Sequence, residues 1–261
     1  GIAAVRVQSP KLFDESINFC KNGNFSAHIH LQEIREEVTA VRNDEGLTPI
    51  QYCSKKGLFD HPTVAAHCVW VDAEDSRILS ENSVGVAHNP ISNMILASGI
   101  CPVPELRSMG VNVGIGIDGA GSNDSQDMLQ SIKITPLLQR VKKMQATALS
   151  ARDAFHMATI EGAKVVGVEK YLGSLEVGKR ADFVILDGDS PVLANIHDPF
   201  QAVVYCAGKT EVKEVWVDGE NIFKDGKVIN VSTDEVVKHS KFQAVKLVEA
   251  AGLSNLSTLK N

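Results

Sequence analysis

A short stretch near the start of the chain carries residues that could hold a metal ion and move a proton. His28 and His30 lie one residue apart in an apolar segment, and Glu33 follows His30 by three residues. A neutral imidazole binds divalent cations, and a carboxylate beside such a cation can carry protons to and from water. An isolated pair of this kind also fits an ordinary strand with partly buried histidines and a helix that starts at a glutamate. Residues further along the chain are therefore needed to distinguish a metal site from an ordinary strand and helix.

Three further residues of the same chemical types recur downstream. His67, His88 and Asp118 follow His30 at successive spacings of 37, 21 and 30 residues, each at or near the end of an apolar segment. The carboxyl ends of parallel strands share one face, which in a (β/α)8 barrel carries the active site. One such histidine would be uninformative, but ligand-type residues at the ends of four successive strands are hard to explain by packing alone.

The segments that would position these residues alternate between strand and helix patterns. Residues 63–71 are almost continuously apolar, which is typical of a strand covered on both faces. The alternation predicts an α/β fold with a parallel sheet. We expect the other strands over residues 2–7, 25–31, 83–88 and 112–118, and helices over residues 11–21, 34–43, 49–56, 72–82, 103–109, 125–143 and 150–167.

The pattern changes after residue 173 to short strand-like segments separated by turns. We expect strands over residues 183–186, 202–206, 212–217 and 227–229, with hairpin turns at Asp218-Gly219 and Asp225-Gly226. An amphipathic helix is expected over residues 233–251. These changes predict three parts: an alternating strand-and-helix part over residues 1–168, a small β-module over residues 169–232, and a C-terminal helix and tail over residues 233–261.

Composition narrows the class of protein. The chain has 26 Lys and Arg against 32 Asp and Glu, a formal charge of −6, so we expect no general affinity for nucleic acid or for anionic membranes. Its five cysteines form no CxxC pair, which indicates reduced, mostly buried thiols in a cytoplasmic protein. No signal peptide and no apolar run long enough to span a bilayer is found.

Several segments together resemble the amidohydrolase superfamily, in the branch of cytosine, guanine and adenosine-type deaminases and triazine chlorohydrolases. Their order and spacing make the resemblance specific. It implies an α/β fold comprising the C-terminal half of a (β/α)8 TIM-type barrel, strands five to eight, followed by part of a small β-sandwich. The matching segments are His30–Glu33, Ala65–Cys68, His88–Leu106, Gly116–Asp124 and Gly173–Asp187.

The resemblance implies a role for each candidate residue. His30 and Asp118 would be metal ligands, and His67 would hydrogen-bond the metal-bound water or the developing tetrahedral oxygen. Glu33 would move a proton from that water to the ring nitrogen and then to the leaving amine. The implied cofactor is one divalent cation, Zn²⁺ in the first place, with Fe²⁺ or Mn²⁺ as alternatives.

Two residues are implied as substrate contacts. Ser122 lies where relatives contact a polar group of the substrate. His88 aligns with a seventh-strand histidine for which a structural role is the alternative.

The implied function is a metal-dependent aminohydrolase. It would deaminate a small nitrogen heterocycle, such as a purine, a pterin or an adenosine-type thioether, by attack of metal-bound hydroxide. Hydrolytic dechlorination or dealkylamination of s-triazines is a second hypothesis, and an inactive half-barrel that acts as an interaction module is a third. Glu33 favours the first, because an amine leaving group must be protonated whereas chloride need not be.

The chain departs from the family in one important respect. The family uses a second histidine pair from the first barrel strand, and His28-Ile29-His30 cannot be that pair. A whole barrel needs roughly 250 residues, whereas only 88 separate His30 from Asp118. Two of the usual four protein ligands therefore remain, and we expect a truncated or partial gene whose product binds metal weakly and has little activity alone. The histidine that relatives carry near residues 3–5 is replaced by Ala3-Ala4-Val5.

An incomplete barrel also predicts a partner. Its unpaired sheet edges and apolar strand faces favour self-association. We expect either a homo-oligomer or binding to the missing N-terminal half-barrel.

Overall fold

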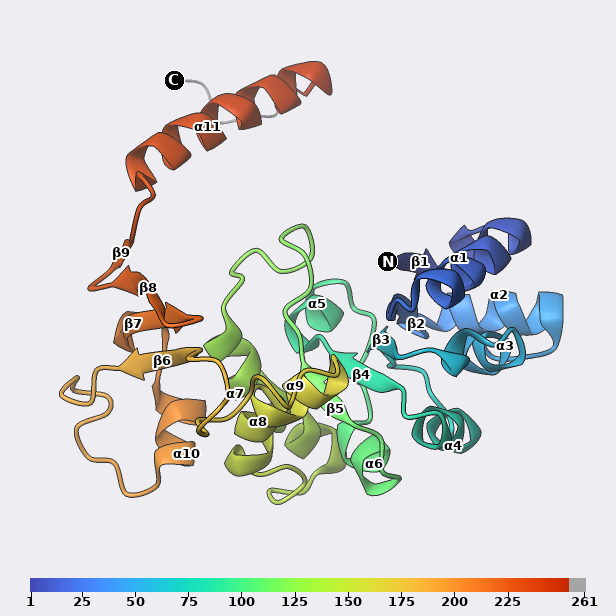
Figure 1. Ribbon diagram of the computed structural model, residues 1–261, viewed down its shortest axis with the longest axis horizontal. Coiled ribbons are helices and arrows are strands. Elements are labelled where there is room, and N and C mark those ends of the chain that lie inside the picture. Colours follow the sequence, from blue (N-terminus) through green and yellow to red (C-terminus); the bar gives the residue numbers. More distant parts are fainter. Residues whose placement is uncertain (254–261) are drawn as a thin grey trace. The chain divides into compact units, whose positions relative to one another are not determined.

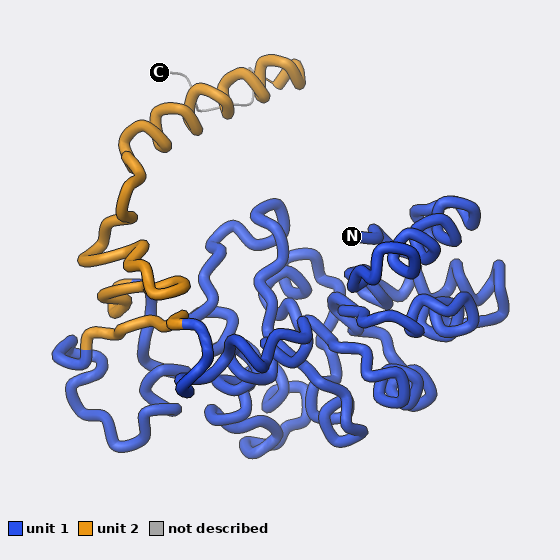
Figure 2. Tube along the Cα trace, in the orientation of Figure 1, with its two compact units in different colours: residues 1–180, 188–209 blue, residues 181–187, 210–261 orange. Residues whose placement is uncertain are grey.

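The computed structural model describes residues 1–253, and these residues form two units (Figures 1 and 2). The first unit comprises residues 1–180 and 188–209, and the second comprises residues 181–187 and those from 210 onward. The three-part division expected from the sequence stays a prediction, and the part of its tail from residue 254 lies outside the described residues.

A five-stranded parallel sheet organises the first unit. Its strands lie side by side in chain order, and every neighbouring pair is parallel. Leu31 pairs with His67, and His88 pairs with Ile115, so the strands end along a common edge. The α/β fold with a parallel sheet is confirmed. The strands are β1 (Ile2–Ala4), β2 (Ala27–Leu31), β3 (Thr63–His67), β4 (Gly85–His88) and β5 (Val113–Ile115).

The helices of this unit begin at residues that suit a helix N-terminus. The hydroxyl of Thr48 accepts from the amide of Gln51 while the Gln51 side chain accepts from the Thr48 amide, and Asp72 and Asp75 form the same reciprocal pair. The helices are α1 (Pro10–Gly23), α2 (Arg35–Glu45), α3 (Pro49–Lys55), α4 (Ala73–Glu81), α5 (Pro90–Ile95), α6 (Val103–Ser108), α7 (Met128–Lys143), α8 (Ala151–Met157), α9 (Ile160–Val165) and α10 (Pro199–Gln201). Short helical turns cover Val5–Val7, Leu58–Asp60, Ala202–Cys206 and Lys209–Glu211.

Two strand glycines allow a helix to approach the sheet closely. A Cβ atom on Gly85 would lie 2.7 Å from the carbonyl oxygen of Val165, and one on Gly114 would lie 2.9 Å from the Cα of Gly162. Both contacts involve backbone atoms of α9, which packs on β4 and β5. Glycine at these positions therefore permits the packing that holds the last two strands of the sheet in place.

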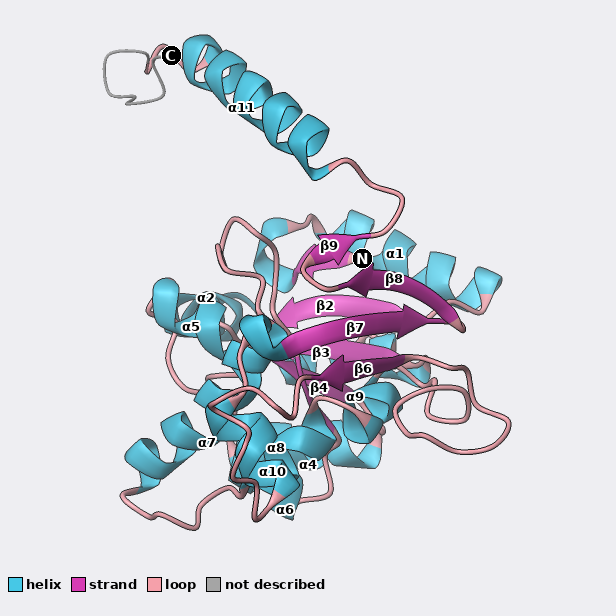
Figure 3. Cartoon of the chain, turned by 90° about the vertical axis from the view of Figure 1, so that its left-hand side faces the viewer, coloured by secondary structure: helices cyan, strands magenta, loops and turns pink. Residues whose placement is uncertain are grey.

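The second unit contains a four-stranded antiparallel sheet, visible in Figure 3 as β6 to β9. The turns at Asp218-Gly219 and Asp225-Gly226 place these four residues at positive φ, as tight hairpins require. Phe183 and Trp216 stack across β6 and β7 with ring centroids 5.6 Å apart. The elements are β6 (Phe183–Leu186), β7 (Val212–Val217), β8 (Glu220–Lys224), β9 (Lys227–Val228) and helix α11 (Thr233–Ala250), which has no buried residue.

Several predicted elements differ from the structure. Residues 202–206 form a π-helical turn that continues α10, not a strand, because Asp198 caps the start of α10 and their β-branched residues pack within the first unit. The helix expected over residues 150–167 is two helices, α8 and α9, interrupted at Thr159, which has non-helical backbone angles. Helix α5 and strand β8 were not predicted.

In the described part of the chain, no helix combines the length and apolar character needed to cross a bilayer.

Candidate active site

Three side chains from three different strand ends converge at the carboxyl edge of the parallel sheet. His30 lies on β2, His67 ends β3, and Asp118 follows β5 by three residues. One ligand atom from each of them lies within 4.8 Å of the others. The two imidazole rings are stacked, with centroids 5.4 Å apart and planes inclined by 19°. His28 shares the face of β2 with His30 but is not one of the three.

The orientation of His30 is set by a backbone group. Its Nδ1 lies 2.6 Å from the carbonyl oxygen of Ala3 in β1. A carbonyl only accepts, so Nδ1 carries the hydrogen and Nε2 keeps its lone pair. This is the tautomer of a histidine that binds metal through Nε2 while its other nitrogen is held by a second group.

His67 is buried, with 1% of its side chain exposed. Its Nδ1 lies 2.8 Å from Oδ1 of Asn93 in α5, so the ring donates there. Its Nε2 has no hydrogen-bond partner within residues 1–253, and it lies 3.8 Å from a Glu33 carboxylate oxygen and 3.9 Å from Oδ2 of Asp118. A buried nitrogen without a partner is costly in an ordinary core, which indicates that Nε2 faces a group bound from outside the chain.

Asp118 is held as a carboxylate by donors on both oxygens. Ser92 and Ser122 donate their hydroxyls to Oδ2 at 2.6 and 2.9 Å, and the Gly119 amide donates to Oδ1 at 2.8 Å. Partial burial opposes ionisation, but these three hydrogen bonds, with His67 nearby, outweigh it and lower the pKa of Asp118 below its ordinary value. The group therefore carries its negative charge at neutral pH.

Glu33 lies beside this cluster at the start of the loop that leads into α2. Ser98 donates its hydroxyl to Oε1 of Glu33 at 2.9 Å, which leaves Oε2 directed toward His67. Glu33 and His30 line the same cavity of about 200 Å³. A carboxylate fixed at one oxygen and open at the other can accept a proton and release it within this cavity.

The backbone is strained at several of these positions. Gln32, His67, Cys68 and Asp118 all have φ between 47° and 74°, a region that residues other than glycine rarely occupy. Such strain costs about 1–3 kcal/mol per residue and clusters at functional sites. It also explains why β3 ends at His67, although the sequence predicted a strand to residue 71, because the left-handed turn carries the chain away from the sheet.

The other two predicted site residues lie in different surroundings. Ser122 donates to Asp118, so the structure places it against the carboxylate. His88 is fully buried and is not one of the three convergent residues, and neither of its ring nitrogens has a hydrogen-bond partner in the described part of the chain. Burial, followed by the proximity of His67, lowers the pKa of His88 to about 3, so its ring is neutral at physiological pH. Their roles as substrate contacts stay predictions.

The sequence reasoning missed the residues that orient the cluster. Ser92, Asn93 and Ser98 hold Asp118, His67 and Glu33 respectively, and all three lie in or just after α5. The segment His88–Leu106 was singled out as a motif without roles for its polar residues. Three hydroxyl- or amide-bearing residues within ten positions of the end of β4 were the available signal.

The residues present fit a divalent cation. Two imidazoles with free Nε2 atoms and one ionised carboxylate form the three-ligand donor set that catalytic zinc sites use, with a further position left for water or substrate. The buried, unpartnered Nε2 of His67 supports this fit most directly.

Comparison with known proteins adds an independent line of evidence. The sequence profile described as Amidohydrolase family matches residues 2–222. A 5'-deoxyadenosine deaminase of Methanopyrus kandleri is 41% identical over 242 residues, which are 93% of this chain and 56% of that protein. A 5-methylthioadenosine/S-adenosylhomocysteine deaminase of Desulforudis audaxviator is 42% identical over 223 residues, 85% of this chain and 52% of that protein.

Solved structures give the same picture of the fold. An adenosine deaminase from Xanthomonas campestris with bound zinc matches with a TM-score of 0.90 and 28% identity, over 94% of this chain and 56% of that one. The atrazine chlorohydrolase from Arthrobacter aurescens, also complexed with zinc, matches with a TM-score of 0.83 and 24% identity, over 91% of this chain and 52% of that one. The chain thus spans about half the length of the relatives it matches.

Proposed function

The chain belongs to the amidohydrolase family, and from that membership we propose that it takes part in the hydrolytic deamination of an adenosine-type purine. Candidate substrates are those that name its relatives: 5'-deoxyadenosine, 5-methylthioadenosine and S-adenosylhomocysteine. The observation that carries the proposal is the convergence of His30, His67 and Asp118 with Glu33 beside them.

His30 and Asp118 would hold the cation, and the His67 ring would face the water molecule bound to it. A zinc-class ion bound there would lower the pKa of a water molecule toward about 7 and so supply a nucleophile at neutral pH. Zn²⁺ is the ion we propose, in line with the zinc bound to the Xanthomonas campestris deaminase.

Glu33 is proposed as the proton carrier. Ser98 fixes one carboxylate oxygen, and the other faces the cluster, so the group can move one proton of the attacking water to the ring nitrogen and then its second proton to the departing amine. An amine leaves as ammonia only when it is protonated, which makes a mobile proton at this position essential.

His67 is proposed to stabilise charge at the reacting oxygen. With Nδ1–H donated to Asn93, a neutral His67 accepts a hydrogen bond at Nε2, and a protonated His67 donates from the same atom. Carboxylate oxygens of Glu33 and Asp118 lie 3.8 and 3.9 Å from that nitrogen. His88 and Ser122 are retained in the proposal as substrate contacts.

We further infer that the parallel sheet is the C-terminal half of a (β/α)8 barrel. Strands β1 and β5 are the outer strands of the described sheet, and the deaminase that matches with a TM-score of 0.90 is about twice as long. The remaining strands would pair along these two edges, supplied by the same polypeptide or by another chain, and would add ligands to the metal site. A cytoplasmic location is part of the proposal, because all five cysteines are free and four are buried.

Dechlorination of triazines is the less favoured chemistry. The triazine hydrolases match at 24% identity, which supports a common fold, whereas proteins named as deaminases match at 41 and 42%.

The test combines metal binding with complementation. Zinc stoichiometry of the chain is measured by plasma mass spectrometry. Ammonia release from 5'-deoxyadenosine is measured after mixing with the part of the Methanopyrus kandleri deaminase that this chain does not match. We expect zinc to be retained and ammonia to be released only in the mixture. Glu33→Gln should abolish release, and Glu36→Gln, on the exposed side of α2, should not. Equal zinc retention by the mixtures made with the His30→Ala chain and with the unmodified chain would contradict the proposal.

A further inference from the structure

A second cavity lies apart from the candidate active site. It has a volume of about 550 Å³, within the range of sites that bind small molecules, and none of the convergent residues lines it. Its polar walls are basic: Arg35 and Arg42 come from α2, and Lys142 comes from the end of α7. We call this cavity the basic groove. The rest of its wall is Thr39, Asp72, Trp70 and the apolar residues Val38, Val69, Val71 and Pro102.

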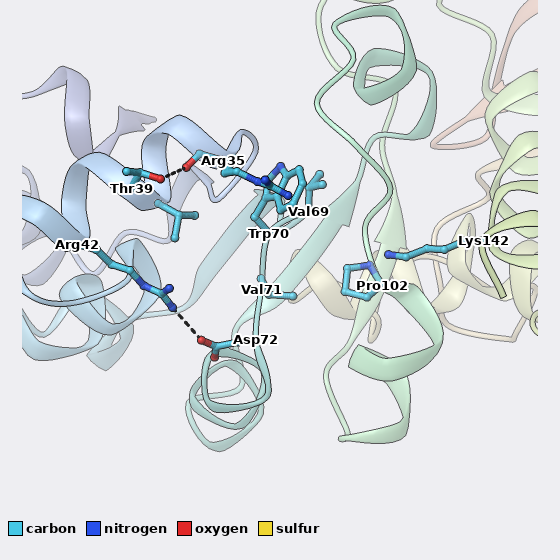
Figure 4. A pocket seen from close by; sticks show the side chains of 10 residues that line it. Arg35, Thr39, Arg42, Val69, Trp70, Val71, Asp72, Pro102 and Lys142 are labelled. Atoms are coloured by element: carbon cyan, nitrogen blue, oxygen red, sulfur yellow. Dashed lines mark hydrogen bonds and ion pairs between the residues drawn. The ribbon is translucent and has the colours of Figure 1, made fainter.

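Positively charged side chains lie on two opposite sides of the basic groove. Figure 4 shows Arg35 lying against Trp70 on one side, while Lys142 extends toward Pro102 on the other. The Arg35 guanidinium lies 4.3 Å from the centroid of the Trp70 ring, which holds it in place. Lys142 donates to the carbonyl oxygen of Ile100 at 2.7 Å, an interaction that leaves its positive charge uncompensated.

The charge balance of the basic groove is positive. Arg42 is paired with Asp72 at 3.1 Å, so one of the three positive charges is offset. Arg35 and Lys142 have no acidic partner among the residues that line the groove. The groove therefore carries two net positive charges although the formal charge of the protein is −6, and it would attract a dianion.

We propose that the basic groove binds a phosphate monoester with an apolar or aromatic organic group. A phosphate monoester is a dianion near neutral pH, and arginine and lysine are the side chains that recognise phosphate. The organic group would lie against the apolar wall, where Val69, Val71 and Pro102 provide the surface and Trp70 remains 36% exposed. Inorganic phosphate shares the anionic part of this chemistry and lacks the rest.

The basic groove is also connected to the candidate site. The Trp70 indole N–H donates to the carbonyl oxygen of Ser98 at 2.9 Å, and the Ser98 hydroxyl holds Glu33. A ligand against Trp70 would thus lie two hydrogen bonds away from the proposed proton carrier. Binding itself does not depend on the proposed function, so the two can fail separately.

The test uses Trp70 as the reporter. The chain has two tryptophans, so in a Trp216→Phe background the tryptophan fluorescence comes from Trp70 alone. We expect phenyl phosphate to change it saturably, inorganic phosphate to bind more weakly, and phenol to have no effect. Phosphate binding as tightly as phenyl phosphate would support the anionic site and remove the organic group from it. Phenol binding as tightly as phenyl phosphate would overturn the proposal. The absence of a saturable change up to 10 mM phenyl phosphate would also overturn it, because this concentration is about a hundredfold above the dissociation constant of a weak small-molecule site.

Variants locate the site. Arg35→Gln and Lys142→Gln should each weaken phenyl phosphate binding about tenfold or more, as loss of a charged hydrogen-bond donor does. Lys142→Arg keeps the charge and should retain binding, which separates loss of recognition from loss of folding. Lys143→Gln is the matched control, because this neighbour pairs with Glu105 and does not line the groove. Wild-type affinity in both Arg35→Gln and Lys142→Gln, confirmed by calorimetry, would overturn the assignment.

Discussion

His67 donates its Nδ1 hydrogen to the side-chain oxygen of Asn93, 2.8 Å away, and this contact determines which ring nitrogen is directed toward the candidate site. Both residues are buried, so water cannot replace either partner. The contact leaves Nε2 as the nitrogen that lies near Glu33 and Asp118. The chemistry available at the centre of the cluster therefore depends on an amide from a neighbouring helix.

Replacing Asn93 with Ala should disturb this tautomer. The Nδ1–H group would be left without an acceptor in a buried position, which costs about 1–3 kcal/mol in the free energy of unfolding. Long-range ¹H–¹⁵N correlation spectra report the tautomer directly. We expect the Nδ1–H form in the wild type, a mixture in Asn93→Ala, and restoration in Asn93→Asp, whose carboxylate still accepts. An Nε2–H form in the wild type would contradict this assignment.

Loss of the Ser92 hydroxyl should weaken metal binding. Ser92 makes the shorter of the two hydroxyl contacts to Oδ2 of Asp118, and groups that orient a metal ligand typically contribute 10- to 100-fold in affinity. We expect Ser92→Ala to lower zinc affinity about tenfold, measured by competition with a chromophoric chelator. Ser108→Ala, an exposed serine of α6, is the control. Unchanged affinity in Ser92→Ala would show that Asp118 is not a ligand or needs no such support.

The positions of the candidate residues were predictable because strands have a strong local signature. An apolar run such as residues 63–67 identifies a strand, and its end then gives the edge at which His67 lies. Parallel pairing follows from the alternation with helices, and it brings His30, His67 and Asp118 together although they are far apart in the sequence.

The supporting contacts were not predictable in the same way. The Ala3 carbonyl that holds His30 has no side-chain signature at all, and it depends on how β1 pairs with β2. Asn93 and Ser98 act through the orientation of α5, which the tertiary packing sets. At residues 202–206 a local signal was present but misleading. Their valines are typical of a strand, whereas tertiary packing keeps the segment helical.

The raised pKa of Glu37 predicts that the stability of the fold depends on pH. Only 2% of this residue is exposed, and burial raises the pKa of Glu37 from 4.5 to about 7. Between these pH values the unfolded chain releases the proton while the folded chain keeps it, so the unfolded state binds fewer protons and stability falls as pH rises. The shift corresponds to about 3 kcal/mol at pH 8 relative to pH 4.

Glu37→Gln should remove this dependence, because its side chain is neutral throughout. Urea denaturation between pH 5 and pH 8 measures the effect, and we expect the variant to be more stable than the wild type at pH 8. Glu36→Gln, one position earlier and exposed, should follow the wild type. Parallel curves for Glu37→Gln and the wild type would refute a raised pKa at Glu37.

Gln32 predicts the largest loss of stability, because one buried side chain satisfies three groups. Its amide nitrogen donates to the carbonyl oxygen of Trp70 at 2.6 Å and to Oδ2 of Asp75 at 2.9 Å, and its oxygen accepts from the amide of Ile50 at 3.1 Å. Asp75 is itself completely buried, and its carboxylate accepts hydrogen bonds from the side chains of Thr48 and Gln32 and from the amide of Asp72.

Gln32→Leu preserves the approximate size of the side chain and removes all three contacts. Each buried polar group left unsatisfied costs about 1–3 kcal/mol, so we expect a loss of about 3–5 kcal/mol in the free energy of unfolding by urea. Gln145→Leu, at an exposed position near the end of α7, should change it by less than about 0.5 kcal/mol. Gln32 immediately precedes Glu33 and has φ of 52°, so its release should also let the proposed proton carrier move. A Gln32→Leu variant as stable as Gln145→Leu would mean that this network does not hold the loop after β2.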